Sequence, residues 1–214
     1  MLMKRFLQLA VALCITVCAH AQFSGTGSGT SSDPYLIFNP IQLDQVRNFT
    51  GTGVYFKMMA DIDLTQFIQE NYPTQGWLPI SGFKGQFDGN GKKITNMTIN
   101  RPTSDYLGLF GYIYAATIKN VAIQGEITGK NYIGGLVGKV YNSPLGKKTT
   151  ISNVKTDVIL DGVSYIGGIV GYVENDYYAD VYYSYTIISN AEVNVDITGT
   201  DYLGKLNSQG KVIY

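Results

Sequence analysis

The sequence predicts an all-β fold, a parallel β-helix (β-solenoid) in which short repeats stack as rungs. Two motifs support this prediction. The first is Tyr-x-Gly-Gly-x-Val-Gly, at Tyr132–Gly138 and Tyr165–Gly171, with a version one glycine shorter at Tyr106–Gly111. The second is Ile-x-Asn, whose isoleucine precedes the motif tyrosine by 14 residues in three repeats. A fixed offset between two motifs, with length variation outside them, is typical of a solenoid with loops on one edge.

The Ile-x-Asn motif predicts what lies inside each rung. Its copies start 24, 33 and 37 residues apart and are Ile94–Asn96, Ile118–Asn120, Ile151–Asn153 and Ile188–Asn190. We expect the four isoleucines to stack in the core, where burying each one contributes roughly 1.5–3 kcal/mol. We expect the four asparagines to form a ladder in which the side-chain amides bond to one another and to the turn backbone.

The N-terminus is typical of a secretory signal peptide covering residues 1–21. Lys4 and Arg5 precede an apolar run of 13 residues, Phe6–Cys18, which is too short to span a bilayer. Ala19–Ala21 then has the small-x-small form of a signal peptidase site. The alternative is a buried N-terminal helix. We expect an exported protein at the cell surface, in the periplasm or outside the cell, with no transmembrane segment after cleavage.

Cleavage would also remove the residues that most enzymes and metal sites use. The only cysteines and the only histidine, Cys14, Cys18 and His20, lie in the expected signal. Their loss would exclude Ser-His-Asp and Cys-His catalysis, zinc sites built from histidine or cysteine, and structural disulfides. We also expect no catalytic residues, no metal site and no cofactor. Losing Lys4 and Arg5 would take 16 basic residues to 14 against 16 acidic ones, a net charge of 14 − 16 = −2. That charge does not favour nucleic acid as a partner.

The expected domain plan places a flexible leader at 22–30 and an N-terminal cap with the first rungs at 31–91. Pro34–Ile37 is predicted as a strand. Asn39 and Pro40 predict the start of a short helix that ends near Asn48, with Asn as N-cap and Pro in the first helical position. The apolar residues expected to face inward from this helix are Ile41, Leu43 and Val46.

The rest of the cap is predicted as strands joined by polar turns. Val54–Leu64 is expected to be a strand pair or a bent strand, with Asp61 and Asp63 on one face. Such a pair of carboxylates binds calcium, performs acid–base chemistry or is a solvated strand end. Thr65–Gly76 is expected to be a polar excursion and Asp88–Gly91 a tight turn. The two aromatic segments between them, expected as strands, are Trp77–Ile80 and Gly82–Phe87.

Residues 92–214 are predicted to form the repeats. Apolar and polar residues alternate in Ile118–Gly129 with a slip near Asn120, which indicates a strand, a bend and a second strand. We expect the glycines of the tyrosine motif at corners where backbones approach closely or φ is positive. A fourth copy starts at Asp201–Gly204 and loses the pattern at Lys205, so the last rung is either a divergent cap or a truncated frame.

These motifs resemble the GLUG-motif repeats of bacterial exported surface proteins, which carry Tyr-Val-Gly-Gly-Leu-Val-Gly. The segments around 28–37, 55–64 and 83–91 are similar to the block that often precedes such repeats. The resemblance implies a right-handed parallel β-helix on a secreted or cell-surface protein. In some members of the family, the repeats are attached to peptidases or adhesins. It implies no catalytic residue set.

Three functions remain open. The first is a non-catalytic, adhesin-like surface module that presents loops to a glycan or a surface protein. The second is a carbohydrate-active enzyme, a polysaccharide lyase or glycosidase, by analogy of fold alone. The third is a structural spacer. An enzyme of the second kind would need carboxylates at a shared site, and the candidates are Asp61, Asp63, Glu174, Asp176 and Asp180.

The longest segment between repeats, from Val173 to Ile188, is the predicted ligand surface. Its tyrosines offer flat apolar faces and hydroxyls that suit sugar rings or protein partners. The alternative is that Asp180–Tyr185 forms an extra strand whose tyrosines pack on the solenoid flank. The predicted ligand-binding residues are Tyr177, Tyr178, Tyr182, Tyr183 and Tyr185.

Overall fold

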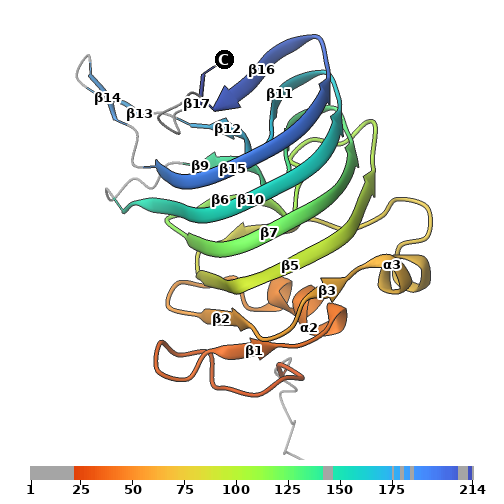
Figure 1. The fold of residues 1–214 in the computed structure, drawn as a ribbon. Helices are drawn as coiled ribbons and strands as arrows, with labels where there is room; N and C mark the ends of the chain where they lie inside the picture. The colour runs from red at the N-terminus through yellow and green to blue at the C-terminus, as the bar shows by residue number, and fades with distance from the viewer. Residues whose placement is uncertain are drawn as a thin grey trace, which may run out of the picture.

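The chain folds into a right-handed parallel β-solenoid. The computed structural model describes residues 22–141, 147–174, 176–178, 181–183, 186–206 and 212–213, with side chains described before 175 and for 186–201. Figure 1 shows the long strands running from left to right in front while the chain climbs and returns behind them, which gives the right-handed coil. The predicted fold is confirmed. The expected signal peptide, 1–21, lies outside the described residues.

Three sheets run along the solenoid, and most rungs add one strand to each. The long sheet has the order β1-β2-β5-β7-β10-β15, with β3 paired to β5. Its strands are β1 (Tyr35–Ile37), β2 (Tyr55–Met58), β3 (Ile62–Asp63), β5 (Gln86–Asn100), β7 (Thr117–Thr128), β10 (Thr149–Asp161) and β15 (Thr186–Thr198). The motif sheet contains β8 (Asn131–Gly134), β11 (Ser164–Gly167), β16 (Asp201–Leu206) and β17 (Val212–Ile213). The return sheet contains β4 (Ile80–Phe83), β6 (Phe110–Tyr114), β9 (Val137–Tyr141) and β12 (Val170–Val173).

The predicted asparagine ladder forms in three rungs. Asn153 Nδ2 donates to Asn120 Oδ1 at 2.9 Å, and Asn190 Nδ2 donates to Asn153 Oδ1 at 3.1 Å. All three residues have positive φ, between 50° and 56°, which asparagine tolerates better than most residues. They therefore bend β7, β10 and β15 at equivalent positions. Two residues before each asparagine, Ile118, Ile151 and Ile188 pair in register on adjacent strands.

The prediction is wrong for the first Ile-x-Asn copy, which does not join the ladder. Phe87 pairs with Ile118, whereas Ile94 pairs with Ile123, because a register shift between Asp88 and Lys92 adds residues to β5 between these two positions. Asp88 Oδ1 takes the place of the expected amide and accepts from Asn120 Nδ2 at 2.9 Å. Asn96 Nδ2 donates instead to Asp63 Oδ2 at 3.0 Å.

The expected turn at 88–91 is a corner inside β5. Asn90 and Gly91 have φ of 52° and 73°, so the strand bends there and continues without reversing. The expected boundary between 91 and 92 therefore falls inside this strand.

The motif glycines are needed for close approach between backbones. A Cβ on Gly138 would lie 2.6 Å from Gly111 O, and one on Gly135 would lie 2.5 Å from Gly168 O. Positive φ occurs instead at the motif tyrosines, Tyr106, Tyr132 and Tyr165, with values of 63°, 58° and 57°. The glycines thus allow neighbouring rungs and sheets to touch without intervening side chains.

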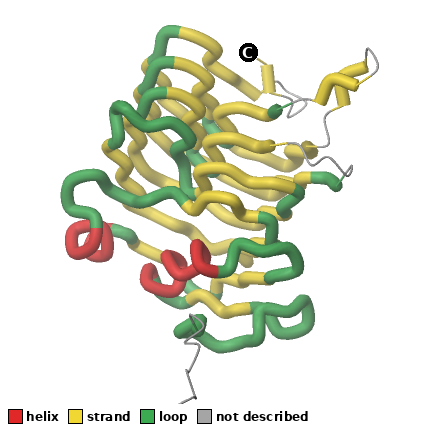
Figure 2. The backbone as a smooth tube through the Cα atoms, turned by 180° about the vertical axis from the view of Figure 1, so that it is seen from behind, coloured by secondary structure: helices red, strands yellow, loops and turns green. Residues whose placement is uncertain are grey.

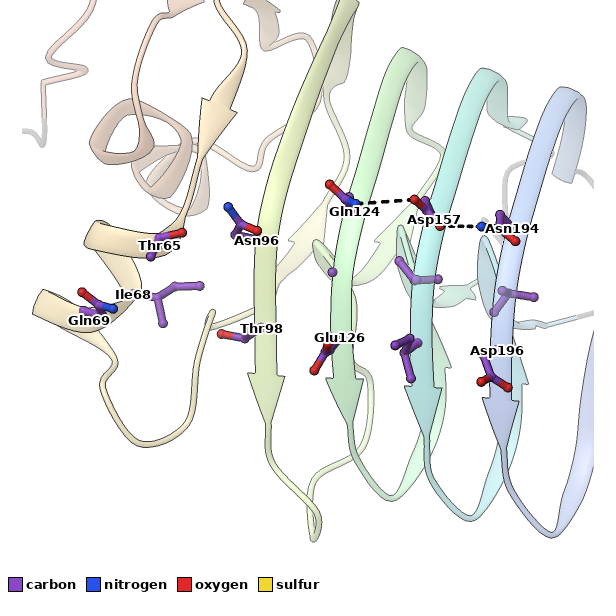
Figure 3. A pocket seen from close by; sticks show the side chains of 14 residues that line it. Thr65, Ile68, Gln69, Asn96, Thr98, Gln124, Glu126, Asp157, Asn194 and Asp196 are labelled. Atoms are coloured by element: carbon purple, nitrogen blue, oxygen red, sulfur yellow. Dashed lines mark hydrogen bonds between the residues drawn. The ribbon is translucent and has the colours of Figure 1, made fainter.

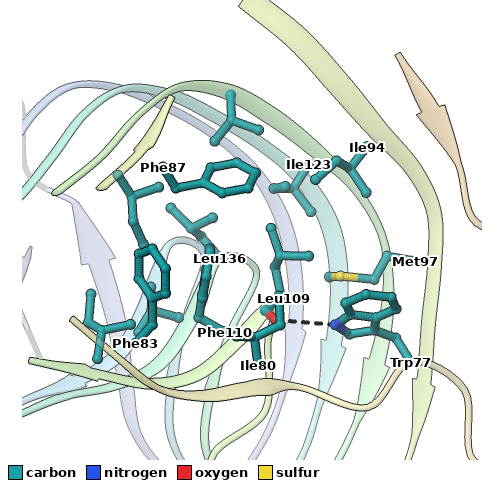
Figure 4. Packing of buried hydrophobic residues seen from close by; sticks show 14 of the residues in the cluster. Trp77, Ile80, Phe83, Phe87, Ile94, Met97, Leu109, Phe110, Ile123 and Leu136 are labelled. Atoms are coloured by element: carbon teal, nitrogen blue, oxygen red, sulfur yellow. Dashed lines mark hydrogen bonds between the residues drawn. The ribbon is translucent and has the colours of Figure 1, made fainter. Parts of the chain in front are cut away.

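The core is aromatic near the N-terminal end and aliphatic in the later rungs. Figure 4 shows Trp77, Phe83, Phe87 and Phe110 packed together with aliphatic side chains. All four are fully buried. The indole Nε1 of Trp77 donates to Leu109 O at 3.2 Å, so its one polar group is satisfied.

The helices lie in the N-terminal part of the described chain (Figure 2). They are α2 (Pro40–Gln45), the 3-10 turn η1 (Val46–Asn48) and α3 (Thr65–Asn71). As predicted, Asn39 Oδ1 caps α2 by accepting from Gln42 N at 3.0 Å. Leu43 and Val46 are buried, but the expectation for Ile41 is wrong, because it lies on the other side of the helix and is 59% exposed.

Two further cap segments differ from expectation. The segment expected as a leader packs on the first rung, where Phe23 is 4% exposed and its ring centroid lies 4.6 Å from that of Tyr35. The polar excursion after Leu64 contains α3, which the sequence analysis missed. Asp63 Oδ1 accepts from Thr65 N at 2.8 Å where this helix begins, and Ile68 is buried against the solenoid.

Candidate functional site

A groove of about 700 Å³ lies on the outer face of the long sheet, beside α3 (Figure 3). The helix supplies one wall through Thr65, Ile68 and Gln69. The floor is the second half of β5, β7, β10 and β15, beyond the asparagine corner. Its lining residues are Asn96, Thr98, Gln124, Gly125, Glu126, Asp157, Val158, Ile159, Asn194, Val195 and Asp196.

A first row of amides and a carboxylate crosses this floor. Gln124, Asp157 and Asn194 are paired in register on adjacent strands. Asn194 Nδ2 donates to Asp157 Oδ1 at 2.7 Å, and Gln124 Nε2 makes a longer contact of 3.5 Å with Asp157 Oδ2. Asn96 lies level with them in Figure 3. The row is held in place by its own hydrogen bonds, while each amide keeps further donor and acceptor capacity.

A second row runs parallel to the first, two residues further along each strand. It consists of Thr98, Glu126, Ile159 and Asp196, which are paired in register. Ile159 is 53% exposed and lies between the two carboxylates. The groove therefore combines hydrogen-bonding groups with an apolar spot, the mixture found in small-ligand sites.

The groove is acidic. Three lining residues are carboxylates, Glu126, Asp157 and Asp196, and none of the described lining residues is basic. Lys155, two residues before Asp157, is ion-paired with Glu192 at 2.6 Å. Across the described part of the chain, no group of three His, Cys, Asp or Glu side chains is placed to hold a metal ion.

A second surface carries stacked tyrosines. The rings of Tyr106 and Tyr132 stack at 5.1 Å, those of Tyr132 and Tyr165 at 4.8 Å, and those of Tyr114 and Tyr141 at 5.0 Å. A side-chain hydrogen bond with Tyr141, together with burial, raises the pKa of Tyr106. Because the rings stack on one another, their flat faces are largely occupied within the protein.

Lys139 lies among these tyrosines. The residue is 8% exposed, and its Nζ lies 3.0 Å from Glu174 Oε1 and 3.8 Å from the ring centroid of Tyr141. Burial acts to lower the pKa of Lys139, but the hydrogen bond and charge of Glu174 outweigh it, and the pKa is raised. The ammonium is therefore satisfied by the protein itself and is not available to a ligand.

The structure describes the backbone of four of the five predicted ligand-binding tyrosines. Tyr177 and Tyr178 lie in β13 (Asp176–Tyr178), and Tyr182 and Tyr183 lie in β14 (Val181–Tyr183). The two strands pair antiparallel, so the extra strand weighed for this segment is present at Val181–Tyr183. The side chains of these four residues, and Tyr185 altogether, lie outside the described part, so their binding role stays a prediction.

The predicted carboxylates do not form a common site in the part that the structure describes. Asp61 Oδ1 accepts from Lys93 N at 2.9 Å, Asp63 Oδ1 accepts from Thr65 N at 2.8 Å, and Glu174 pairs with Lys139. Asp176 lies in β13, but its side chain is outside the described part of the structure. Asp180 lies outside the described residues altogether.

Sequence reasoning missed the residues of the groove. A signal was present, because Gln124, Asp157 and Asn194 each follow a ladder asparagine by four residues. Three members of the second row, Glu126, Ile159 and Asp196, follow the same asparagines by six. The motif offset thus marks equivalent outward positions on every rung. What it could not indicate is that α3 folds beside these rows and turns a flat strand surface into a groove.

Comparisons with known proteins give relatives but no family. No family model matches the chain. It is 34% identical over 152 residues to a candidate Gly-rich membrane protein of Evansella cellulosilytica, which covers 58% of this chain and 17% of the relative. It is 29% identical over 150 residues to halomucin of Haloquadratum walsbyi, which covers 53% of this chain and 2% of the relative. The chain thus spans less than a fifth of the length of either curated relative.

A solved structure, that of a candidate immunoglobulin A1 protease from Bacteroides ovatus, is similar with a TM-score of 0.46 and 16% identity, covering 88% of this chain and 94% of that one. An identity this low says nothing about shared activity. Within the described residues, no helix has the length and apolar character needed to cross a bilayer.

Proposed function

We propose that the chain is a non-catalytic, exported surface module of the GLUG-repeat kind, and that it holds a glycan in the groove beside α3. The observation that carries the proposal is the pair of parallel polar rows on the groove floor, repeated on successive rungs. Binding residues mounted on paired strands are held rigidly, which favours recognition.

The chemistry of the rows suits sugars. Amide and carboxylate side chains such as Asn194 and Glu126 donate to or accept from hydroxyl groups, and sugars present both kinds of partner. The exposed Ile159 offers an apolar contact for the C–H face of a ring. The groove volume of about 700 Å³ falls within the usual range of ligand sites.

Binding without cleavage is part of the proposal. After signal cleavage the chain would contain neither cysteine nor histidine. The candidate acids Asp61, Asp63 and Glu174 have partners within the protein. In the groove, Asp157 accepts two contacts from its neighbours in the row. A glycosidase would instead use Glu126 and Asp196 as an acid and a base. In the binding test below, this alternative would release new reducing ends from the polysaccharide.

Export rests on the ordered basic, apolar and small-residue elements of residues 1–21. One relative is named a membrane protein, which supports a role at the cell envelope. N-terminal sequencing of the protein recovered outside the inner membrane is expected to begin at or near Gln22. Recovery of the intact Met1 terminus from the cytoplasm would contradict export.

The binding test is titration calorimetry of the secreted chain against a panel of polysaccharides. The double variant Gln124→Ala and Asn194→Ala is expected to weaken binding by roughly tenfold or more, since each lost hydrogen bond is worth about 1 kcal/mol. Asn100→Ala, an exposed amide on β5 outside the groove, is the matched control. No binding to any polysaccharide, or release of new reducing ends from a bound one, would overturn the proposal.

A further inference from the structure

We propose that the ligand of the groove is an uncharged linear polysaccharide that lies along the solenoid axis, across the strands, with one sugar unit per rung. This inference rests on the proposed function and goes further by naming the ligand class and its direction. It follows from three properties of the groove: the direction of its rows, its charge and its closed end.

The rows set the direction of the ligand. Gln124, Asp157 and Asn194 lie side by side on adjacent strands, so equivalent groups repeat across the sheet and not along a strand. Neighbouring strands of a sheet lie roughly 4.7–4.9 Å apart. That spacing is close to the length of one pyranose unit in an extended chain, so a linear polymer crossing the strands meets equivalent side chains at each unit.

The charge sets the class of sugar. Glu126, Asp157 and Asp196 give the groove three carboxylates with no basic residue among its described lining. A uronate or sulfated chain would place a negative charge at each unit against these groups, and opposing like charges costs several kcal/mol. Hydroxyl groups of a neutral sugar meet the same carboxylates as hydrogen-bond donors, which is favourable.

The helix sets the length of the site. Thr65, Ile68 and Gln69 of α3 form the wall next to β5, at one end of the groove. A bound polysaccharide therefore ends at α3, and the described strands β5, β7, β10 and β15 offer it four successive positions. We expect the affinity to rise with each unit from a disaccharide to a tetrasaccharide, since each added unit meets one more of these strands.

The test compares neutral and acidic oligomers of matched length, from a disaccharide to a hexasaccharide, by titration calorimetry. Linear glucan, mannan and xylan oligomers are the neutral probes, and oligogalacturonates are the acidic ones. The best neutral series is expected to bind at least about tenfold more tightly than the acidic series at low salt, with the gap narrowing as salt screens the charges. Equal or tighter binding of the oligogalacturonates, or an affinity independent of length, would overturn the inference.

An isosteric variant tests whether the carboxylates cause the discrimination. Glu126→Gln with Asp196→Asn keeps the shape of the second row and removes two charges. The ratio of neutral to acidic affinity is expected to fall about fivefold or more, while Asp161→Asn, an exposed acid at the end of β10 outside the groove, keeps the ratio. An unchanged ratio in the double variant would contradict the charge argument even if glycan binding itself is found.

Discussion

The groove and the tyrosine surface are built by the same device and differ in what remains available to a ligand. Each consists of like side chains repeated at equivalent positions of stacked rungs. On the tyrosine surface the rings of Tyr106, Tyr132 and Tyr165 stack on one another, and Lys139 is neutralised by Glu174. On the groove floor Gln124, Asp157 and Asn194 use only part of their hydrogen-bonding capacity on one another.

The difference teaches that repetition alone does not make a binding site. A ladder of flat rings uses its attractive faces internally, so its contribution is mainly to stability. A ladder of amides and carboxylates has more donors and acceptors than its neighbours can use, so it can stabilise the rungs and still bind a ligand. Changes on the tyrosine side are therefore expected to alter stability, and changes in the groove to alter binding.

The largest expected effect comes from the glycine beneath the tyrosine ladder. Gly138→Ala would place a Cβ 2.6 Å from Gly111 O and 2.7 Å from Tyr106 C, both backbone atoms that cannot move without separating the rungs. We expect a loss of about 3 kcal/mol in the free energy of unfolding, measured by urea denaturation. A loss below about 1 kcal/mol would show that the rungs can separate cheaply.

The asparagine corner separates backbone strain from hydrogen bonding. Asn153→Ala removes the bonds to Asn120 and Asn190 and leaves alanine at a φ of 53°, so we expect a loss of about 2 kcal/mol. Asn153→Gly loses the same bonds but accepts positive φ, and it is expected to be less damaging. Equal midpoints for the two variants in thermal unfolding would mean that the conformation at this corner costs nothing.

The buried lysine predicts a dependence on alkaline pH. Because the folded-state pKa of Lys139 is raised, its contribution is fully present below the ordinary lysine pKa of about 10.4 and is lost as pH rises through the folded value. Lys139→Met keeps most of the apolar contacts and removes the charge. We expect it to cost about 1 kcal/mol at neutral pH, discounted for the partly exposed Glu174.

The check is the stability difference between the wild type and Lys139→Met as a function of pH. That difference should shrink as the pH rises above about 10, whereas tyrosine ionisation acts on both proteins. A difference that stays constant from neutral pH into this range would show that the ion pair with Glu174 does not contribute.

The smallest effect on stability is expected in the groove. Gln124→Ala with Asn194→Ala removes exposed side chains and leaves the pairing of their strands unchanged, so the free energy of unfolding should change by less than about 0.5 kcal/mol per site. The same variant is the one expected to lose glycan binding. A large drop in its thermal midpoint would mean that the rows serve stability as the tyrosines do, and the contrast between the two surfaces would fail.

The sequence by itself determined the solenoid and most of its register. The fixed distance between Ile-x-Asn and the tyrosine motif placed Ile118, Ile151 and Ile188 on one another, and asparagine was predictable at a bend because it tolerates positive φ. The first repeat was misplaced because β5 contains two irregularities, one before Ile94 and one after it. An inserted residue changes which side chains pair without changing the motif.

Only the tertiary structure decided where a ligand could bind. The polar residues of the groove are unremarkable in the chain, since an outward strand position is polar in most sheets. They become a candidate site because α3, a helix with a single buried side chain at Ile68, packs beside β5 and forms one wall of the groove. Tyrosine content likewise could not distinguish a binding surface from a packed ladder, because that depends on whether the rings stack on each other, and stacking is set by the distance between rungs.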